Sequence, residues 1–362
     1  MKITEVKTYI AEAGRQNWLF VKVSTDNGLY GWGEASVEGQ EKAAEACIRV
    51  LADRSVIGED PRNVEKIWRQ MYHHGFWKGG FIHMTAVSGI DQAIWDLLGR
   101  FYKTPTYMLL GGQVRDKVRT YTHSSSSEIA GKCMEMGFAG VKTGAPSGML
   151  DEVLSGTRKV IGSNRDLMVD NHGQLSTADA VKRLKIAEKY DLLFYEEPVP
   201  PENAMEYKRL RDSSYEVPLA AGERLFSRFD FRQMIENQFV DFVQPDICHC
   251  GGISEIRRIA SYAEVYHIGF APHNPNGPVA TAASIQVALS TQNFAILEFA
   301  AMNVYNNSEL FSMDLKPVDG FFKTPSAPGF GIEINESRLL EHTYKDIQYE
   351  PMYNEDGSVA EI

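Results

Sequence analysis

The 362-residue sequence predicts an α/β protein in which a parallel β-barrel follows a smaller N-terminal α+β domain. Three observations support this fold class. The first hundred residues place strand patterns before helical patterns, and later residues alternate short apolar runs with helical stretches. The chain is also long enough for about two domains. Its 43% hydrophobic and 23% charged residues are typical of a globular protein and exclude a disordered or fibrous one.

Residues 1–115 have the pattern of the α+β domain. Two alternating runs, Asn17–Thr25 and Leu29–Ala35, flank an Asp-Asn-Gly turn and predict an antiparallel hairpin. Apolar residues then recur at helical spacing in three segments, which are Lys42–Leu51, Val64–Tyr72 and Met84–Phe101. The pattern changes after a Gly-Gly pair, so we place the domain boundary near Asp116.

Residues 116–320 have the pattern of repeated strand–helix units. Eight apolar runs predict strands, which are Val118–Thr122, Gly140–Thr143, Leu167–Val169, Leu192–Tyr195, Leu219–Ala221, Phe239–Val243, Gly269–Ala271 and Ala295–Leu297. Helical patterns between them, such as Thr177–Tyr190 and Ile253–Tyr266, favour a parallel sheet, and a barrel closes eight such strands most economically.

Two further segments bear on assembly and domain organisation. Pro278–Thr291 is uncharged on every side, which predicts a helix buried all round, against the other domain or against another subunit of a homo-oligomer. Residues 321–362 form a C-terminal segment with a strand pattern at Gly329–Ile334. We expect this segment to return to the first domain.

Composition excludes several classes of function. With 37 Lys and Arg against 48 Asp and Glu, the net charge of −11 disfavours binding to nucleic acid or to an anionic membrane. The first residues lack a signal-peptide pattern, so a cytoplasmic location is expected. Four cysteines are too few for a disulfide scaffold. Cys248-His249-Cys250 lacks the second ligand pair that a structural zinc site needs.

Ionisable residues stand just after successive predicted strands. They are Lys142, Asp170, Glu196, Glu223, Asp246, His273 and Glu298, at separations of 28, 26, 27, 23, 27 and 25 residues. Each separation is one strand, loop and helix, so all seven side chains should converge on the carboxyl ends of the barrel strands. A charged residue after a strand is usually a solvated loop residue, but that explanation would require seven coincidences in register.

Asp170, Glu196 and Glu223 predict a metal site. Three converging carboxylates repel one another and require a cation. Oxygen ligands select a hard ion, which favours Mg²⁺ over zinc. Glu197 directly follows Glu196 and should point away if the strand continues, so we assign it no role at the metal.

Asp246 and His273 end neighbouring strands, where the carboxylate can fix the imidazole tautomer and make a general base. His172 stands two residues after Asp170 and should face the same substrate, although a locally hydrogen-bonded loop histidine is the alternative. A metal flanked by such bases suits proton abstraction next to a carboxylate, with the metal stabilising the enediolate. Glu298, if protonated or sharing a proton, could donate a hydrogen bond to that carboxylate, and Lys142 adds positive charge.

Motifs spread over nearly the whole chain carry a family resemblance. They include Gly31-Trp32-Gly33-Glu34, Ser88–Asp96, Tyr195-Glu196-Glu197-Pro198, Ala221–Asp230, Gln244-Pro245-Asp246 and Ala271-Pro272-His273. Through them the chain resembles the mandelate racemase subgroup of the enolase superfamily, and within it the galactonate dehydratase-like acid-sugar dehydratases. The resemblance implies an N-terminal α+β capping domain, completed by the C-terminal tail, over a modified (β/α)₇β TIM-type barrel that holds Mg²⁺.

The resemblance also implies a reaction. In family dehydratases the histidine of the Asp246–His273 dyad abstracts the C2 proton, and the histidine of an Asp-x-His motif, here His172, protonates the departing C3 hydroxyl. One departure bears on this expectation, because Lys142-Thr143-Gly144 lacks the second lysine of the family's Lys-x-Lys motif. Its loss counts against racemisation unless His172 substitutes for it.

We therefore expect a Mg²⁺-dependent hydro-lyase that converts an aldonate such as galactonate to a 2-keto-3-deoxy acid. A racemase, epimerase or cycloisomerase acting on a 2-hydroxy acid or an acid-sugar lactone through the same enediolate is one alternative. A barrel retained only for binding is another. Trp18 and Trp77, in capping-domain segments 15–18 and 73–78, are candidate substrate contacts, with packing at the domain interface as their alternative.

Overall fold

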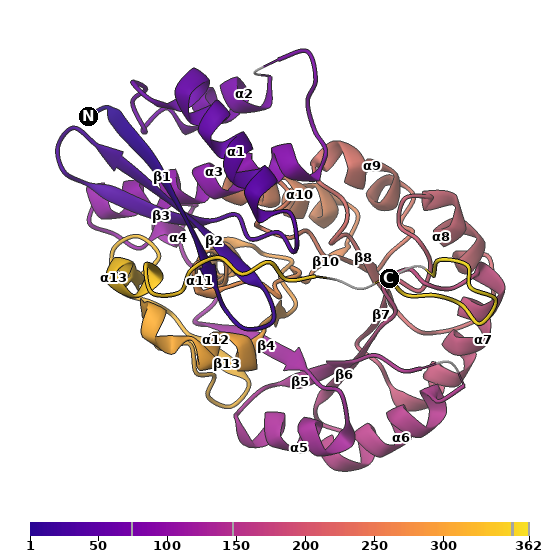
Figure 1. Ribbon diagram of the computed structural model, residues 1–362. Coiled ribbons are helices and arrows are strands. Elements are labelled where there is room, and N and C mark those ends of the chain that lie inside the picture. The colour runs from indigo at the N-terminus through magenta and orange to yellow at the C-terminus, as the bar shows by residue number, and fades with distance from the viewer. Residues whose placement is uncertain (74, 147, 349–350, 361–362) are drawn as a thin grey trace.

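The computed structural model describes residues 1–73, 75–146, 148–348 and 351–360, and its N-terminal part is an antiparallel sheet covered by helices (Figure 1). The strand order is β1-β2-β3. The elements are β1 (Ile3–Glu12), β2 (Asn17–Thr25), β3 (Tyr30–Glu34), α1 (Glu41–Leu51), a π-helical turn (Ala52–Val56), α2 (Val64–Tyr72), α3 (Phe81–Phe101) and α4 (Thr106–Leu109). The predicted hairpin is confirmed, and each predicted helix is present within three residues of its expected start.

Glycine allows β3 to lie directly on α3. A Cβ atom at Gly31 would stand 2.1 Å from the Ala93 carbonyl oxygen, and one at Gly33 would stand 2.0 Å from the Gly89 carbonyl oxygen. Since no side chain fits in that space, the Gly-Trp-Gly-Glu motif brings sheet and helix backbones together. This contact fixes the position of Glu34 at the end of β3.

Eight parallel strands form the second part, as predicted. They are β4 (Lys117–His123), β5 (Gly140–Thr143), β6 (Asp166–Asp170), β7 (Phe194–Glu196), β8 (Leu219–Ala221), β9 (Phe242–Val243), β10 (Gly269–Phe270) and β11 (Leu297–Glu298). The helices between them are α5 (Ser127–Glu135), α6 (Leu150–Ile161), α7 (Thr177–Ala187), α8 (Ala204–Arg211), α9 (Arg228–Glu236), α10 (Gly252–Val265) and α11 (Pro278–Ser290).

The parallel sheet curls into a barrel. Its strand order is β10-β9-β8-β7-β6-β5-β4-β11. A bridge between Phe270 and Phe294 joins β10 to the residues before β11 and closes the circle. Eight strands and seven intervening helices make the expected (β/α)₇β barrel within the described residues.

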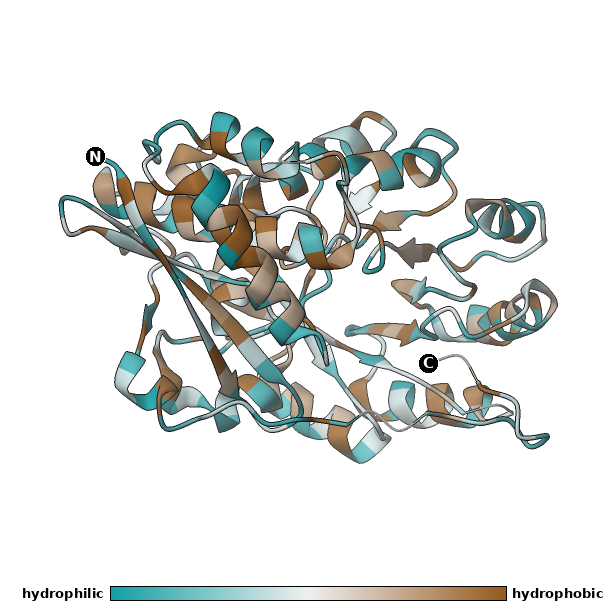
Figure 2. Cartoon of the chain, turned by 45° about the horizontal axis from the view of Figure 1, so that its top comes forward, coloured by the Kyte–Doolittle hydropathy of each residue, from teal (hydrophilic) through white to brown (hydrophobic). Residues whose placement is uncertain are grey.

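Side chains fill the barrel interior and leave polar groups at one end. Tyr121, Met168 and Phe194 belong to a small cluster of buried residues contributed by the strands. Because strand residues alternate between faces, Asp170 and Glu196 point the same way as Met168 and Phe194, one step nearer the carboxyl end. Figure 2 shows hydrophilic residues in teal mainly on the outward faces of the surrounding helices.

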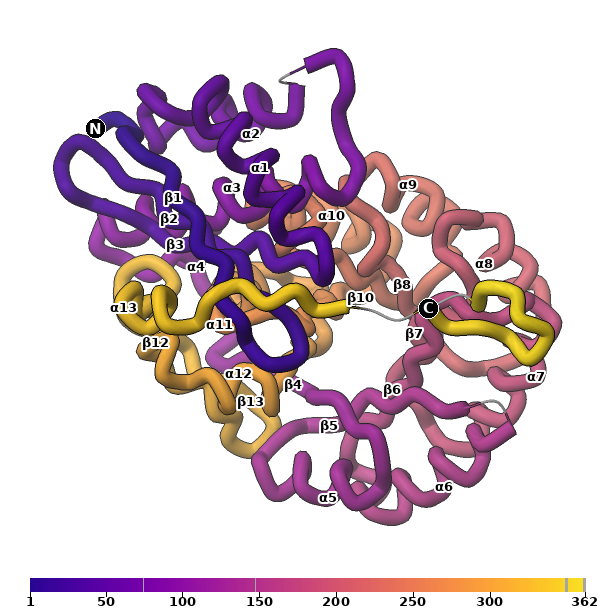
Figure 3. Tube along the Cα trace, in the orientation of Figure 1, coloured from indigo at the N-terminus to yellow at the C-terminus, as the bar shows by residue number. Residues whose placement is uncertain are grey.

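The C-terminal segment contains α12 (Ala301–Asn306), β12 (Phe311–Ser312), β13 (Phe321–Lys323), β14 (Glu333–Ile334) and α13 (Glu336–Leu339). Its later part crosses the N-terminal strands, as Figure 3 shows in yellow over indigo. There Thr343 forms a bridge with Ala11, and the Lys345 N–H donates to Asn17. In contrast, β13 pairs with barrel strand β4. We propose the division 1–115, 116–320 and 321–362, of which residues 74, 147, 349–350 and 361–362 lie outside the described residues.

Helix α11 is buried within this chain. It packs against α4, β3, α10 and β4, and every residue from Pro278 to Leu289 is buried. Its uncharged surface is therefore explained by the other domain, the first of the two alternatives, without a second subunit. Across the described residues, none of the helices combines the length and apolar character needed to cross a membrane.

Candidate active site

The barrel brings Asp170, Glu196 and Glu223 together. Asp170 ends β6, Glu196 ends β7, and Glu223 stands two residues after β8. One carboxylate oxygen from each lies within 4.8 Å of the others. Two oxygens on opposite sides of a Mg²⁺ ion would be about 4.2 Å apart, since each lies about 2.1 Å from the ion. The spacing and the all-oxygen ligand set therefore fit a small hard cation.

Glu196 adds a second observation in favour of a cation. Its side chain is fully buried, and its Oε1 atom has no hydrogen-bond partner. Burial and the neighbouring Asp170 raise the pKa of Glu196 well above its usual value. A buried carboxylate oxygen without a partner is costly unless a ligand satisfies it.

Lys142, on β5, supplies positive charge to the same cluster. Its Nζ lies 3.0 Å from Asp170, 2.7 Å from Glu196 and 2.7 Å from Glu298. Burial lowers the pKa of Lys142, but these three carboxylates outweigh it and raise the pKa well above its usual value. Lys142 is therefore a charged ammonium group shared by three acids.

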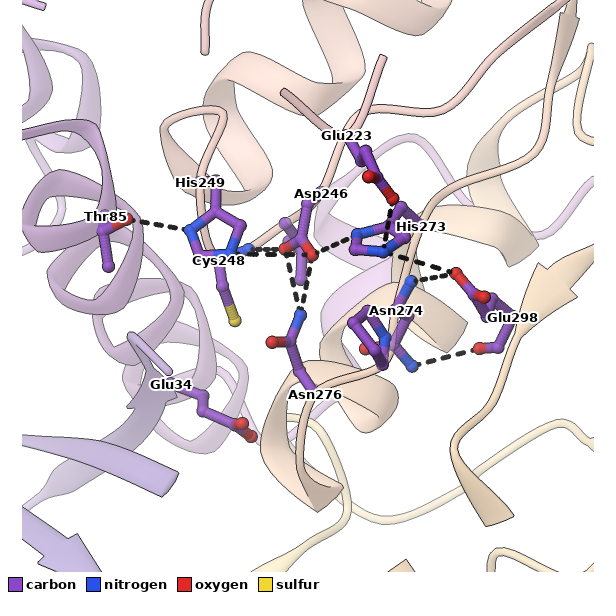
Figure 4. Close-up of polar contacts among 12 residues, drawn as sticks. Glu34, Thr85, Glu223, Asp246, Cys248, His249, His273, Asn274, Asn276 and Glu298 are labelled. Carbon is purple, nitrogen blue, oxygen red and sulfur yellow. Dashed lines mark hydrogen bonds and ion pairs between the residues drawn. The ribbon is translucent and has the colours of Figure 1, made fainter. Parts of the chain in front are cut away.

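His273 and Asp246 form a hydrogen-bonded pair (Figure 4). His273 Nδ1 donates to Asp246 Oδ2 at 2.8 Å, and His273 Nε2 lies 2.9 Å from Glu223 Oε2. Burial raises the pKa of Asp246, but His249, His273 and the Cys248 N–H outweigh it and lower the pKa. Burial lowers the pKa of His273, whereas Glu223, Glu298 and Asp246 raise it well above its usual value. Glu223 thus belongs both to the carboxylate cluster and to the surroundings of His273.

His172 stands at the edge of the cluster. Its backbone adopts a left-handed conformation with φ of 46°, and its Nε2 lies 3.3 Å from Asp170 Oδ2. The hydrogen bond with Asp170 raises the pKa of His172 against the effect of burial. The side chain is 57% exposed. His172 is therefore hydrogen-bonded locally and also accessible from solvent. Both interpretations, a substrate-facing histidine and a loop histidine with a local hydrogen bond, are consistent with this position.

Glu197 and Arg224 hold the loop that carries His172. The Arg224 guanidinium pairs with Glu197 at 2.6 Å and donates to the His172 carbonyl oxygen at 2.9 Å. Burial and Glu223 raise the pKa of Glu197 to about 8. Glu197 is paired with Arg224 and is not part of the three-carboxylate cluster, and no role at the metal was assigned to it from the sequence.

Glu298 lies among two basic side chains and a backbone N–H group. Lys142 and His123 both contact Oε1, and the Asn274 N–H donates to Oε2 at 2.9 Å. Burial raises the pKa of Glu298, but Lys142, His273 and His123 outweigh it and lower the pKa well below its usual value. These contacts favour the ionised form of Glu298, and its hydrogen bond to the substrate from a protonated or proton-sharing carboxyl group stays a prediction.

Sequence reasoning missed His123. It is the last residue of β4 and its Nε2 contacts Glu298. It stands only 19 residues before Lys142, outside the spacing that linked the other seven positions. The same strand-end argument would have found it, because it directly follows the predicted strand Val118–Thr122.

The two tryptophans lie in different surroundings. Trp18 is fully buried and packs edge-on against Phe20, and a Cβ at Gly277 would stand 2.9 Å from its ring. It therefore packs between β2 and the start of α11, as the alternative interpretation expected. Trp77 is 87% exposed and contacts Phe76, so interface packing does not describe it. His74, in the same predicted segment, lies outside the described residues.

The Cys248-His249-Cys250 segment has a packing role. Both cysteines are fully buried, and His249 Nδ1 hydrogen-bonds the Thr85 hydroxyl at 2.8 Å. Among the described residues, the one cluster with metal-ligand geometry is Asp170, Glu196 and Glu223.

These features define a class of protein: a capped (β/α)₇β barrel whose strand ends carry three carboxylates beside an imidazole–carboxylate pair. Two family models match the chain. One describes the mandelate racemase / muconate lactonizing enzyme N-terminal domain and matches residues 2–111. The other describes the enolase C-terminal domain-like family and matches residues 127–338. The chain belongs to the enolase superfamily, in its mandelate racemase subgroup, whose members bind a divalent metal.

Solved structures of similar chains agree with this assignment. An enolase from Agrobacterium radiobacter, provisionally named a galactarate dehydratase and bound to sodium and L-malate, is 30% identical with a TM-score of 0.93, over 99% of this chain and 100% of its own. A provisionally named dehydratase from Salmonella enterica is 30% identical with a TM-score of 0.89, over 95% and 99%. A mandelate racemase/muconate lactonizing enzyme from Burkholderia, also provisionally named, is 31% identical with a TM-score of 0.90, over 99% and 100%.

Proposed function

We propose that this protein is a Mg²⁺-dependent hydro-lyase that dehydrates an acid sugar, such as the aldonate galactonate, to a 2-keto-3-deoxy acid. The observation that carries the proposal is the His273–Asp246 pair, whose second imidazole nitrogen lies 2.9 Å from Glu223 of the carboxylate cluster. The dehydratase names of similar structures support it. So does the L-malate in one of them, because malate is a 2-hydroxy acid.

Each residue has a distinct part in the proposed reaction. In its neutral form, held at Nδ1 by Asp246, His273 takes the C2 proton at Nε2 and leaves an enediolate on the substrate carboxylate. Lys142 places positive charge near that developing negative charge. His172 gives a proton to the C3 hydroxyl, which leaves as water when the C3–O bond breaks. The resulting enol tautomerises to the 2-keto acid.

Asp170, Glu196 and Glu223 are the residues that would hold the cation. When bound there, a divalent ion would supply fixed positive charge to the substrate carboxylate as the enediolate develops. The partnerless oxygen of Glu196 is the feature of this chain that best supports such a ligand.

A screen of acid sugars tests the proposal. Purified protein is incubated with Mg²⁺ and a library of aldonates and aldarates, and 2-keto acids are assayed. We expect at least one acid sugar to give a 2-keto-3-deoxy acid, and we expect EDTA to abolish that turnover. If no aldonate or aldarate reacts in the presence of Mg²⁺, the proposal is wrong.

Racemisation or epimerisation remains the second candidate because two histidines, His172 and His273, both adjoin the carboxylate cluster. Two bases on opposite sides of C2 could remove a proton and return one to the other face. Solvent deuterium that enters C2 while the hydroxyl at C3 is retained would favour this reaction over dehydration.

A further inference from the structure

The loop between β10 and α11 carries the proposed base, His273, and two residues that bond its carboxylate neighbours. Besides His273, it contains Asn276, whose Nδ2 donates to both oxygens of Asp246 at 3.0 and 2.9 Å. It also contains Asn274, whose N–H and side-chain Nδ2 donate to the side chain and the carbonyl oxygen of Glu298. The geometry of the His273–Asp246 pair therefore depends on where this loop sits.

The loop is tied to the capping domain at Glu34. This residue ends β3, and its fully buried carboxylate accepts hydrogen bonds from three backbone N–H groups. The donors are Gly277 at 2.6 Å, Val279 at 3.1 Å and Ala280 at 2.9 Å. They lie at the start of α11, directly after Asn276. A carboxylate at this end satisfies N–H groups that have no partner within the helix.

The Glu34 carboxylate is closely packed and held in one orientation. A Cβ atom at Gly277 would stand 2.7 Å from a Glu34 carboxylate oxygen and 2.9 Å from the Trp18 ring. Ser36 donates to Glu34 Oε1 at 2.7 Å, which orients the carboxylate. Gln16, also in the capping domain, donates to the Pro275 carbonyl oxygen at 3.0 Å. Two capping-domain side chains thus hold the four residues that follow His273.

The other half of the pair is held by the same domain. After Asp246, the chain contacts α3 through a hydrogen bond between His249 and Thr85, shown in Figure 4. Gln92, also on α3, donates to the Ile247 carbonyl oxygen at 3.1 Å and to the Glu34 carbonyl oxygen at 2.8 Å. The loops of Asp246 and of His273 are therefore fixed against one rigid unit of α3 and β3.

We propose that Glu34 is a positioning residue for the reaction: from the capping domain it fixes the first turn of α11 and thereby aligns His273 with Asp246. The inference rests on the proposed function in one respect, that His273 is the base. It gives the capping domain a part in setting the geometry of the base, in addition to covering the substrate.

Glu34→Gln tests the proposal in the full-length protein, because it keeps the size of the side chain and removes one of its two acceptor oxygens. We expect faster hydrogen exchange confined to the start of α11 and the preceding loop, with the affinity for Mg²⁺ alone unchanged. We also expect kcat to fall by about a hundredfold with little change in KM, as a displaced base would cause.

Asp96→Asn is the matched control. Asp96 is also a fully buried carboxylate of the N-terminal part, and it accepts from the Trp32 and Phe330 N–H groups at 2.9 and 2.7 Å. One of its contacts leads to the C-terminal segment and the other to β3 two residues before Glu34, but neither replaces the hydrogen bonds of Glu34 to the start of α11. We expect this variant to lose stability while the folded protein keeps its kcat and the exchange protection of the loop.

Two results would overturn the inference: wild-type kcat in folded Glu34→Gln, or a loss of exchange protection that spreads evenly over the chain. If Glu34→Gln does not fold, Gln16→Ala provides the test. We expect a smaller loss of exchange protection at the same loop, and unchanged protection there would contradict the inference. Since hydrogen exchange and Mg²⁺ affinity need no substrate, they decide the structural claim even if no acid sugar reacts. A failed substrate screen would instead remove the proposed function.

Discussion

Asp246 is the residue on which the contacts of the proposed base converge. It accepts hydrogen bonds from His273 Nδ1, from Asn276 and from the Cys248 N–H. With three partners it stays ionised, and it fixes the His273 tautomer so that Nε2 is the nitrogen turned toward Glu223. The arrangement gives His273 one defined orientation before a substrate arrives.

His273→Asn should lower turnover by about a thousandfold, because general bases contribute rate factors of this order. Mg²⁺ binding should survive, since Asp170, Glu196 and Glu223 remain. Steady-state kinetics and calorimetric titration with Mg²⁺ measure the two effects. His267→Asn is the control, because His267 lies in a left-handed turn before β10, at the opposite end of the barrel, and asparagine tolerates that conformation. Unchanged turnover in His273→Asn would show that another group is the base.

His172→Asn should separate the two proton transfers. Asparagine tolerates the φ of 46° at this position but cannot protonate a leaving hydroxyl. We expect the variant to exchange the substrate's C2 proton with solvent while it forms no keto acid. Proton NMR of the substrate in D₂O measures the exchange. Loss of both exchange and elimination would contradict the separate roles of the two histidines.

The residues of the site could be predicted where strand position determines them. Asp170 and Glu196 directly end strands, so alternation along each strand fixes where their side chains point. The ionised state of Glu298 could not be predicted, because it depends on Lys142 and His123 approaching one oxygen from two other strands. The packing of Trp18 could not be predicted for the same reason, since its burial depends on how the N-terminal sheet packs against α11.

At the scale of elements, α3 joins the two domains through a row of polar residues. Ser88, Asp91 and Gln92 face the barrel, where they bond Gly251, Ser254 and Ile247. Asp91 accepts from both the N–H and the hydroxyl of Ser254, at 2.9 and 2.6 Å, and so satisfies an N–H group in the first turn of α10. The row fixes α10 against α3.

Asp91 predicts a pH dependence of stability. Burial raises its pKa to about 7, against the hydrogen bonds from Ser254. The folded state therefore binds a proton more tightly than the unfolded state, and the stability this contributes is present below pH 4 and is lost as pH rises to about 7. Relative to Asp91→Asn, the free energy of unfolding of the wild type should fall by up to about 4 kcal/mol over that pH range. Urea unfolding of both proteins at several pH values measures the difference, and parallel curves would contradict it.

The sequence predicted element types better than element ends. Periodicity identified α2 as Val64–Tyr72 because one face is buried and the other is exposed. The strand predicted at Phe239–Val243 is only Phe242–Val243, because apolar residues before it pack as a loop. The β13 strand was missed, since its pairing with β4 joins residues about two hundred positions apart, which local patterns do not record.

At the scale of the whole molecule, the barrel supplies the chemical groups and the capping domain fixes the loops that hold two of them. The proposed cation ligands come from β6, β7 and the residues after β8, which are continuous parts of one sheet. His273 and Asp246 instead stand on loops that α3 and β3 restrain. Metal binding and alignment of the base are therefore expected to be separable.

Mg²⁺ should stabilise the folded protein. A ligand that binds only the folded state at about a hundred times its Kd adds about 2.7 kcal/mol, so Tm should rise with Mg²⁺ and fall after EDTA. Asp170→Asn should remove this response, whereas Asp179→Asn, an exposed aspartate on α7, should keep it. Thermal unfolding over a range of Mg²⁺ concentrations measures the effect. An unchanged response in Asp170→Asn would place the cation elsewhere.

Turnover of acid sugars in D₂O, followed by NMR of the product, tests the central claim most directly. If His273 removes the C2 proton and the C3 hydroxyl leaves, the enol must take its new proton from solvent, so the 2-keto acid should carry one deuterium at C3. Recovery of the starting acid sugar with deuterium at C2 and all its hydroxyl groups in place, with no keto acid formed, would contradict dehydration.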